Sequence, residues 1–265
     1  MMGLRIVFFG AGNISRALIE GLIASGYEKK LICYIDRNKA NSARSKRLGI
    51  RKLQIKSLNS KDIIFLAVKP KDALNAYKDI CMSIKKPKII SLVAGIKSSK
   101  YLSIAENVEL IRAMPNTSSR FGKGITAIHN ISASGTTNNK VNAIIKKTGI
   151  ILLISRESQI NDFTGLIGSG PAYFFYLLKV YEKHILKLCD GNNKAKDEII
   201  GNLFEGIALS IKGQNTLDEL IDAVASKRGT TEAGLNDFKS SKLSKNFEKG
   251  IISAIKRSKE ISNEF

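Results

Sequence analysis

The sequence predicts an α/β protein in which a doubly wound, mostly parallel sheet is followed by an all-α domain. In the first half of the chain, short and almost continuous apolar runs alternate with stretches of helical spacing. This alternation is typical of parallel strands that are covered on both faces. From about Asp162 onward the strand patterns stop and apolar residues recur every three to four positions. The change of period predicts one domain over residues 1–160 and a second over residues 161–265.

Seven apolar runs are expected to form the strands of the sheet. They are Leu4–Phe9, Leu31–Ile35, Ile63–Ala67, Ile89–Val93, Val108–Arg112, Ile125–His129 and Ile150–Ile154. The helices expected between them are Ile14–Ser25, Lys39–Arg47, Asp72–Ile84 and Asn138–Lys147. Longer helices are expected in the second half, over Ala172–Leu188, Lys194–Lys212, Leu217–Ala225, Thr231–Phe238 and Ser244–Ile261.

A glycine-rich turn, Gly10-Ala-Gly12-Asn-Ile-Ser15, follows the first strand and opens a helix. Gly10 permits a tight turn. Gly12 has no side chain, so a pyrophosphate can approach the amides at the start of the helix. Ser15 stands where a third glycine is usual. It is small enough for the helix to pack closely on the strand, and its hydroxyl is also expected to reach a phosphate. A turn in this context predicts dinucleotide binding.

The end of the second strand is expected to select the dinucleotide. Asp36 suits the ribose diol of NAD, whereas Arg37 suits the extra phosphate of NADP. Because the two residues are adjacent, the sequence leaves NADH and NADPH open. In a purely structural alternative, Asp36 caps the following helix.

Three further strand ends carry residues that are unusual for strand termini. They are Lys69-Pro70, Ala94-Gly95 and Met114-Pro115-Asn116-Thr117. In a parallel sheet these ends converge on one edge, where ligands bind. The small pair Ala94-Gly95 is expected to let a ring lie against the backbone.

Two loops in the helical half are candidates for substrate binding. Gly168-Ser169-Gly170-Pro171 precedes a long apolar helix. Residues 226–231, with the sequence SKRGTT, precede another helix whose free amides suit a carboxylate. In the structural alternative for this loop, Thr230 or Thr231 merely caps the helix ahead of Glu232.

Composition limits the classes of partner. Lys and Arg number 43 against 23 Asp and Glu, a net charge of +20, but the basic residues are spread along the chain and no tryptophan is present. We therefore expect no specific nucleic-acid partner, although the positive field attracts anionic ligands. Three widely spaced cysteines predict neither a metal site nor disulfides. No membrane span or export signal is evident, so a cytoplasmic protein is expected.

Taken together, the motifs GAGNIS, AVKP, VAGI, RAMPNT, GSGPAY and S-x-x-GTT resemble those of the pyrroline-5-carboxylate reductase family, in the family's order and over essentially the whole chain. RAMPNT and GSGPAY together are the most specific pair. The resemblance implies an N-terminal Rossmann domain and a C-terminal helical domain that interleaves with a partner subunit. It also implies NADPH- or NADH-dependent reduction of 1-pyrroline-5-carboxylate to L-proline, by a homodimer that can assemble further, for example into a decamer.

The resemblance also implies roles for individual residues. With Asp36 and Arg37, which come from their place at the end of the second strand, the predicted cofactor-binding set is Gly10, Gly12, Asn13, Ile14, Ser15, Asp36, Arg37, Ala67, Val68, Lys69, Pro70, Ala94, Gly95 and Asn116. Met114 and Pro115 match a segment near the nicotinamide. The substrate-binding set is Lys69, Ser226, Gly229, Thr230 and Thr231, and Thr231 is the catalytic candidate because its hydroxyl would donate to the ring nitrogen.

Two alternatives stay open, one because the chain departs from the family pattern and the other because a second class of dehydrogenase shares the Rossmann-plus-helical layout. The family usually reads SPGGTT in the last motif, whereas this chain has Lys227 and Arg228 in place of the proline and the first glycine. A catalytically impaired homologue that binds a nucleotide or polyanion is therefore one alternative. A β-hydroxyacid-type dehydrogenase with Lys179 or Lys183 as its catalytic lysine is the other.

Overall fold

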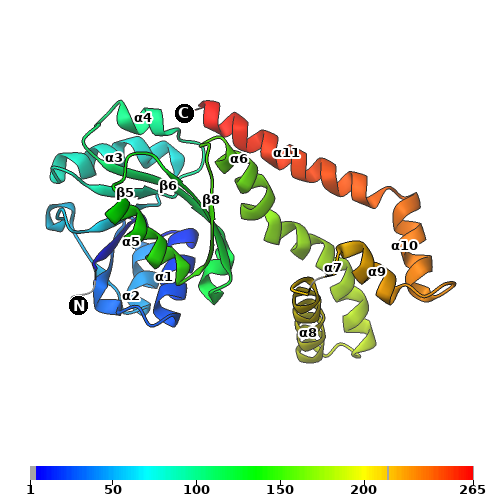
Figure 1. Cartoon of the computed structure of the whole chain (residues 1–265). Coiled ribbons are helices and arrows are strands. Elements are labelled where there is room, and N and C mark those ends of the chain that lie inside the picture. Colours follow the sequence, from blue (N-terminus) through cyan, green and yellow to red (C-terminus); the bar gives the residue numbers. More distant parts are fainter. Residues whose placement is uncertain (1–3, 214, 265) are drawn as a thin grey trace. The chain divides into compact units, whose positions relative to one another are not determined.

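The computed structural model describes residues 4–213 and 215–264 (Figure 1). Residues 1–3, 214 and 265, which the two predicted domains include, lie outside this description. The contacts divide the chain into two compact units. The first contains the residues up to Ser169 together with those from Ser253 onward, and the second contains Gly170–Ile252.

The first unit is built on an eight-stranded sheet in the order β3-β2-β1-β4-β5-β6-β7-β8. The strands are β1 (Ile6–Phe9), β2 (Ile32–Ile35), β3 (Arg51–Lys52), β4 (Ile63–Leu66), β5 (Lys88–Ser91), β6 (Glu109–Pro115), β7 (Gly124–Asn130) and β8 (Gly149–Leu153). All neighbouring pairs are parallel except β6 with β7. The predicted sheet is confirmed, and β3 is a two-residue addition that is too short to leave a periodic signal.

Helices flank the sheet in the first unit, and helices alone make up the second unit. They are α1 (Asn13–Ala24), α2 (Lys39–Arg47), α3 (Pro70–Ser83), α4 (Ser98–Leu102), α5 (Gly135–Lys146), α6 (Gln159–Phe163), α7 (Gly170–Leu188), α8 (Asn193–Ile211), α9 (Leu217–Val224), α10 (Thr230–Ser240) and α11 (Leu243–Glu264). Short 3-10 turns cover Lys29–Leu31, Ile55–Ser57 and Thr117–Phe121, and a π-helical turn covers Thr164–Gly168. The helices α4 and α6 were not predicted from the sequence, because five residues are too few to show a helical period.

Alternating side chains along the strands enter two separate cores. On β1, Phe8 belongs to the core that contains Leu18 of α1 and Val141 of α5, and it stacks on Phe65 with ring centroids 5.0 Å apart. Val7 points to the opposite core, which contains Tyr77 of α3. A sheet buried on both faces explains why its strands are apolar without interruption.

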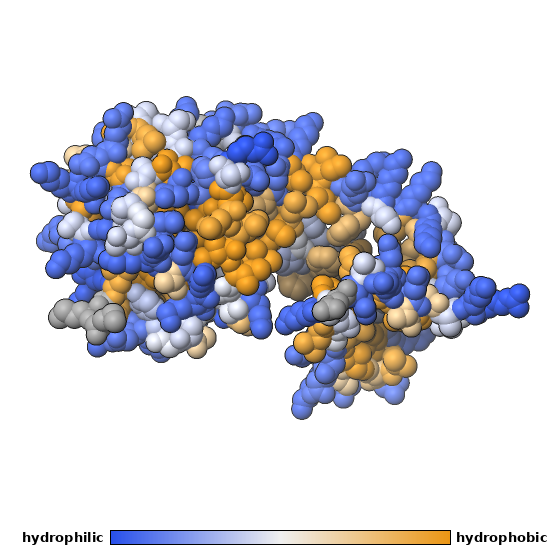
Figure 2. All heavy atoms as spheres, viewed as in Figure 1, coloured by the Kyte–Doolittle hydropathy of each residue, from blue (hydrophilic) through white to orange (hydrophobic). Residues whose placement is uncertain are grey.

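The second unit consists of helices whose apolar side chains are largely exposed in the single chain. On α7, Phe175 is 66 % exposed and Tyr176 is 74 % exposed. Figure 2 shows orange, hydrophobic areas on the surface of this helical part of the chain. Apolar surface of this extent is typical of a surface that binds another protein. Among the helices of the described residues, none is long and apolar enough to cross a membrane.

Candidate active site

The glycine turn after β1 has the geometry that an anion site needs. Gly10 has a positive φ of +96°, and a Cβ there would lie 2.6 Å from the carbonyl oxygen of Ala67. Only glycine therefore fits between the ends of β1 and β4. At Gly12, a Cβ would meet nothing within 4 Å, and this residue is the N-cap of α1, which has no side-chain capping hydrogen bond. Open space beside uncapped helix amides fits a pyrophosphate.

Ser15 packs inside this turn rather than facing a ligand. Its side chain is fully buried, and its hydroxyl donates to the carbonyl oxygen of Gly10 at 2.7 Å. The expected contact with a phosphate is therefore wrong for this hydroxyl, because the turn itself uses it. A small residue is still required, since the helix packs closely against the strand.

Asp36 joins the second strand to the glycine turn. Its Oδ2 accepts a hydrogen bond from the Ala11 amide at 2.7 Å and another from Asn41 Nδ2 at 3.0 Å, and its Oδ1 accepts from the Asn38 amide at 2.7 Å. The N-cap of α2 is Asn38, so the capping alternative for Asp36 is wrong. Arg37 is exposed beside it. The acidic side chain is thus already bonded within the protein, whereas the basic one is accessible to a ligand.

The other strand ends lie along the same edge of the sheet. Because β1, β4, β5 and β6 are parallel, their carboxyl ends meet there. Lys69 is exposed and precedes Pro70, the first residue of α3. Asn116 is buried, and its Oδ1 accepts from the Ile125 amide at 3.1 Å. The structure therefore assigns the Asn116 oxygen to holding β6 against β7.

Gly95 is packed against the C-terminal helix. It has a φ of +80°, and a Cβ there would lie 2.5 Å from Cγ2 of Ile261 in α11. The expectation that this glycine leaves room for a ring is wrong on that side of the backbone, because Ile261 fills the space. The small residue is required by an element that sequence reasoning did not associate with it.

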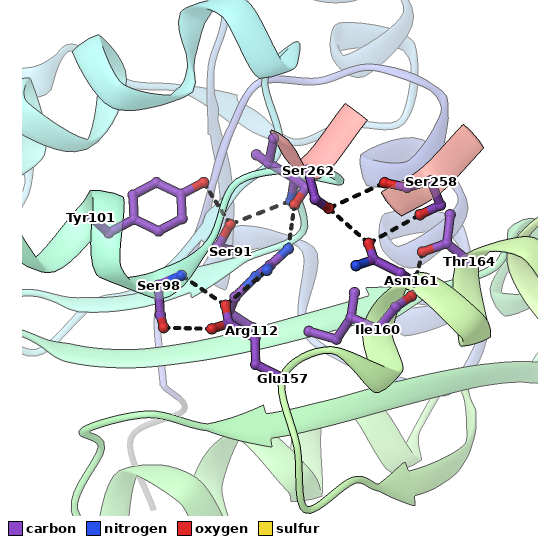
Figure 3. Close-up of polar contacts among 11 residues, drawn as sticks. Ser91, Ser98, Tyr101, Arg112, Glu157, Ile160, Asn161, Thr164, Ser258 and Ser262 are labelled. Carbon is purple, nitrogen blue, oxygen red and sulfur yellow. Dashed lines mark hydrogen bonds and ion pairs between the residues drawn. The ribbon is translucent and has the colours of Figure 1, made fainter. Parts of the chain in front are cut away.

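Arg112 and Glu157 form a largely buried ion pair next to residues 93–95, and Figure 3 shows the two side chains of this pair. Arg112 of β6 donates from Nη1 to Glu157 Oε1 at 2.9 Å and from Nη2 to the carbonyl oxygen of Val93 at 2.9 Å. Ser98 donates to the same carboxylate from its amide and its hydroxyl, each at 2.7 Å. Burial alone would raise the pKa of Glu157, but the hydrogen bonds from Arg112 and Ser98 outweigh it and the pKa is lowered. Sequence reasoning missed this pair, although an arginine inside the apolar run ELIRAMP was the available signal.

The loop 226–231 belongs to the second unit. The Gly229 amide donates to the Ser226 carbonyl at 2.9 Å, and a Cβ at Gly229 would collide with Ser226 Oγ. Gly229 is the N-cap of α10 and no side chain caps this helix, so the capping alternative for Thr230 and Thr231 is wrong. The first amides of α10 therefore remain available to an anionic group.

Comparison with known proteins identifies the family. A family model described as pyrroline-5-carboxylate reductase dimerisation matches residues 157–261, and one described as NADP oxidoreductase coenzyme F420-dependent matches residues 5–95. Pyrroline-5-carboxylate reductase 1 of Bacillus subtilis is 33 % identical, over 98 % of this chain and 90 % of its own length. The chain belongs to the pyrroline-5-carboxylate reductase family. The resemblance seen in the motifs is confirmed, and the β-hydroxyacid alternative is set aside.

Solved structures support the same assignment. A pyrroline-5-carboxylate reductase from Coxiella burnetii is 28 % identical and superposes with a TM-score of 0.81 over 97 % of this chain and 98 % of its own. The pyrroline carboxylate reductase of Plasmodium falciparum shares the fold, with a TM-score of 0.85, 23 % identity and 99 % coverage of both chains. The two-part architecture with a helical dimerisation domain is thereby confirmed, and the protein self-associates through that domain.

The departure from the family's SPGGTT pattern has a structural cost. Arg228 has a φ of 57°, a left-handed conformation that costs a residue with a Cβ about 1 kcal/mol. Arg228→Gly is therefore expected to raise the free energy of unfolding by about 1 kcal/mol, measured by urea denaturation. Lys227 is not among the positive-φ residues of the described chain, so Lys227→Gly is the matched control and should not stabilise. Equal effects of the two changes would contradict the strain at position 228.

Proposed function

We propose that the protein reduces 1-pyrroline-5-carboxylate to L-proline with NADPH or NADH. Two observations together support this most. The glycine turn at residues 10–12 leaves open space beside helix amides that no side chain caps, and the chain matches the pyrroline-5-carboxylate reductase family over nearly its whole length. When bound, the reduced dinucleotide supplies a hydride for the imine carbon. A proton completes the secondary amine at nitrogen, so atoms and charge balance.

The chain's own residues bind and orient the reactants. The amides at the start of α1 hold the pyrophosphate, and the edge formed by Ala67, Val68, Lys69 and Pro70 borders the dinucleotide. The first amides of α10 bind the substrate carboxylate, with Ser226, Gly229 and Thr230 shaping the loop. The Thr231 hydroxyl donates to the ring nitrogen. Because an imine takes up a proton readily, orientation rather than a strong general acid provides most of the rate.

Thr231→Ala is expected to lower kcat about tenfold, because it removes one hydrogen bond to a polar atom of the reacting ring. Dinucleotide affinity should stay within twofold of wild type, since the change lies in the substrate loop. The measurement is steady-state oxidation of NADPH with pyrroline-5-carboxylate, next to Thr231→Ser, which keeps the hydroxyl and should retain most of the turnover. An unchanged kcat in the alanine variant would show that another residue holds the nitrogen. No oxidation of either cofactor by the wild type would contradict the proposed function itself.

NADPH is the preferred cofactor in this proposal. Asp36 already accepts three hydrogen bonds from the protein, whereas the exposed Arg37 is available to a 2′-phosphate. Arg37→Ala should lower kcat/KM for NADPH about 30-fold and leave kcat/KM for NADH within twofold. Lys39→Ala, which removes another exposed cation from the start of α2, is the matched control. Equal losses with both cofactors would assign Arg37 a structural role.

The proposed self-association starts from a homodimer. A homodimer buries the exposed apolar side chains of the second unit, and dimers assemble further into rings such as a decamer. The proposed location is the cytoplasm, because nothing in the composition calls for an oxidising compartment. Light scattering of the purified protein measures the assembly directly.

A further inference from the structure

The last turns of α11 pack directly on the segment that follows β5. Ile261 occupies the space in which a side chain at position 95 would lie, with its Cγ2 2.5 Å and its backbone carbonyl oxygen 3.3 Å from an ideal Cβ there. Gly95 itself is buried and has a φ of +80°. Glycine adopts positive and negative φ about equally readily, so only its surroundings hold residue 95 in this one conformation. Here, Ile261 provides part of those surroundings.

Within the first unit, hydrogen bonds fix this end of α11 to α6 and to the segment after β5. The hydroxyls of Ser258 and Ser262 both donate to Asn161 Oδ1 of α6, at 3.1 and 2.8 Å (Figure 3). Both serines are buried. Near the helix end, Lys97 Nζ donates to Asn263 Oδ1 at 3.2 Å. The position of Ile261 is therefore set by bonds on either side of it along the helix.

Arg112 of β6 also holds this segment, residues 93–95, in place from the side of the sheet. Its guanidinium donates to the carbonyl oxygen of Val93, the residue before Ala94-Gly95, and Glu157 orients that guanidinium. Residues 93–95 thus lie between a buried ion pair and the C-terminal helix. They follow β5, which is the neighbour of β4 in the sheet, and Gly10 contacts the end of β4. This places the segment near the carboxyl edge where a dinucleotide extends.

We propose that Ile261 is a positioning residue for the dinucleotide: its side chain holds Ala94-Gly95 in the backbone conformation that receives the nicotinamide end. The proposal rests on the proposed function in one respect, the assignment of Ala94-Gly95 to that end of the cofactor. A segment that adopts the competent conformation only part of the time weakens apparent affinity by the same fraction. Loss of the contact therefore affects dinucleotide binding before it affects the substrate.

The test compares three changes at Ile261 with one control. Ile261→Ala removes Cγ2, Ile261→Leu keeps the volume but moves the branch away from Cβ, and Ile261→Val keeps both the branch and Cγ2. Arg257→Ala is the control, because Arg257 lies on the same helix and is 58 % exposed in ion pairs with Glu260 and Glu264. The measurements are the Kd of NADPH from its fluorescence in the absence of substrate, the KM of both reactants, and the midpoint of thermal unfolding.

Ile261→Ala and Ile261→Leu are expected to raise the Kd and KM for NADPH about fivefold and to leave the KM for pyrroline-5-carboxylate within twofold. Ile261→Val and Arg257→Ala should match the wild type. A merely structural role would lower the unfolding midpoint and the active fraction but leave the Kd unchanged, and that result overturns the proposal. Should the alanine variant not fold, the leucine variant decides. A wild type that binds NADPH without reducing the imine contradicts the proposed function alone, and the Kd series still tests Ile261.

Discussion

Gly12→Ala is expected to weaken dinucleotide binding about 100-fold while changing the free energy of unfolding by no more than about 1 kcal/mol. A Cβ at Gly12 meets nothing within 4 Å, and its φ of −72° suits any residue. The folded chain therefore tolerates alanine, with only the small penalty of a poorer N-cap. The pyrophosphate does not tolerate it, because the added methyl lies where the phosphates approach the amides of α1. Fluorescence titration with NADPH and urea denaturation measure the two quantities separately.

Gly10→Ala is the informative comparison for Gly12→Ala. Its Cβ would lie 2.6 Å from the Ala67 carbonyl oxygen, and its φ is +96°. We expect it to lower the free energy of unfolding by about 2–4 kcal/mol even without cofactor, because both the backbone conformation and the contact with β4 are lost. If Gly12→Ala binds NADPH as the wild type does, the pyrophosphate lies elsewhere and the site assignment fails.

Arg112→Ala is expected to lower the free energy of unfolding by about 3 kcal/mol at pH 7. The arginine side chain is only 5 % exposed and Glu157 is 25 % exposed, so the change leaves a largely buried carboxylate and the Val93 carbonyl without their donor. Breaking a buried pair in this way costs more than the pair contributes as a whole. Arg257→Ala, at an exposed ion pair, is the matched control and should cost less than about 1 kcal/mol.

The pH dependence separates the ion pair from simple loss of packing at Arg112. The pKa of Glu157 is lowered in the folded state, so its contribution is present above the ordinary glutamate pKa of 4.5 and is lost as the pH falls through the lowered value. The difference in unfolding free energy between wild type and Arg112→Ala should therefore shrink below pH 4.5. A difference that stays constant from pH 7 to pH 3 would mean that packing, not charge, holds Arg112.

The substrate loop shows how far local patterns reach. Gly229 and the two threonines that follow it predicted a loop before a helix, and the structure has this arrangement. Which residue begins the helix was not predictable, because glycine and threonine are both acceptable N-caps. The strain at Arg228 was also invisible, since a positive φ follows from the path of the chain and not from the residue type.

The sequence by itself determined every strand except β3, most of the helices, the glycine turn and the family, because each depends on local periodicity or on short contiguous motifs. Only the tertiary structure decided what the side chains at the sheet edge contact. It directed Ser15 inward to Gly10, bonded Asp36 to the amide of Ala11, and placed Ile261 over Gly95. Such contacts join residues that are distant along the chain, so no local period records them. They arise only when the strands align and the last helix packs against them.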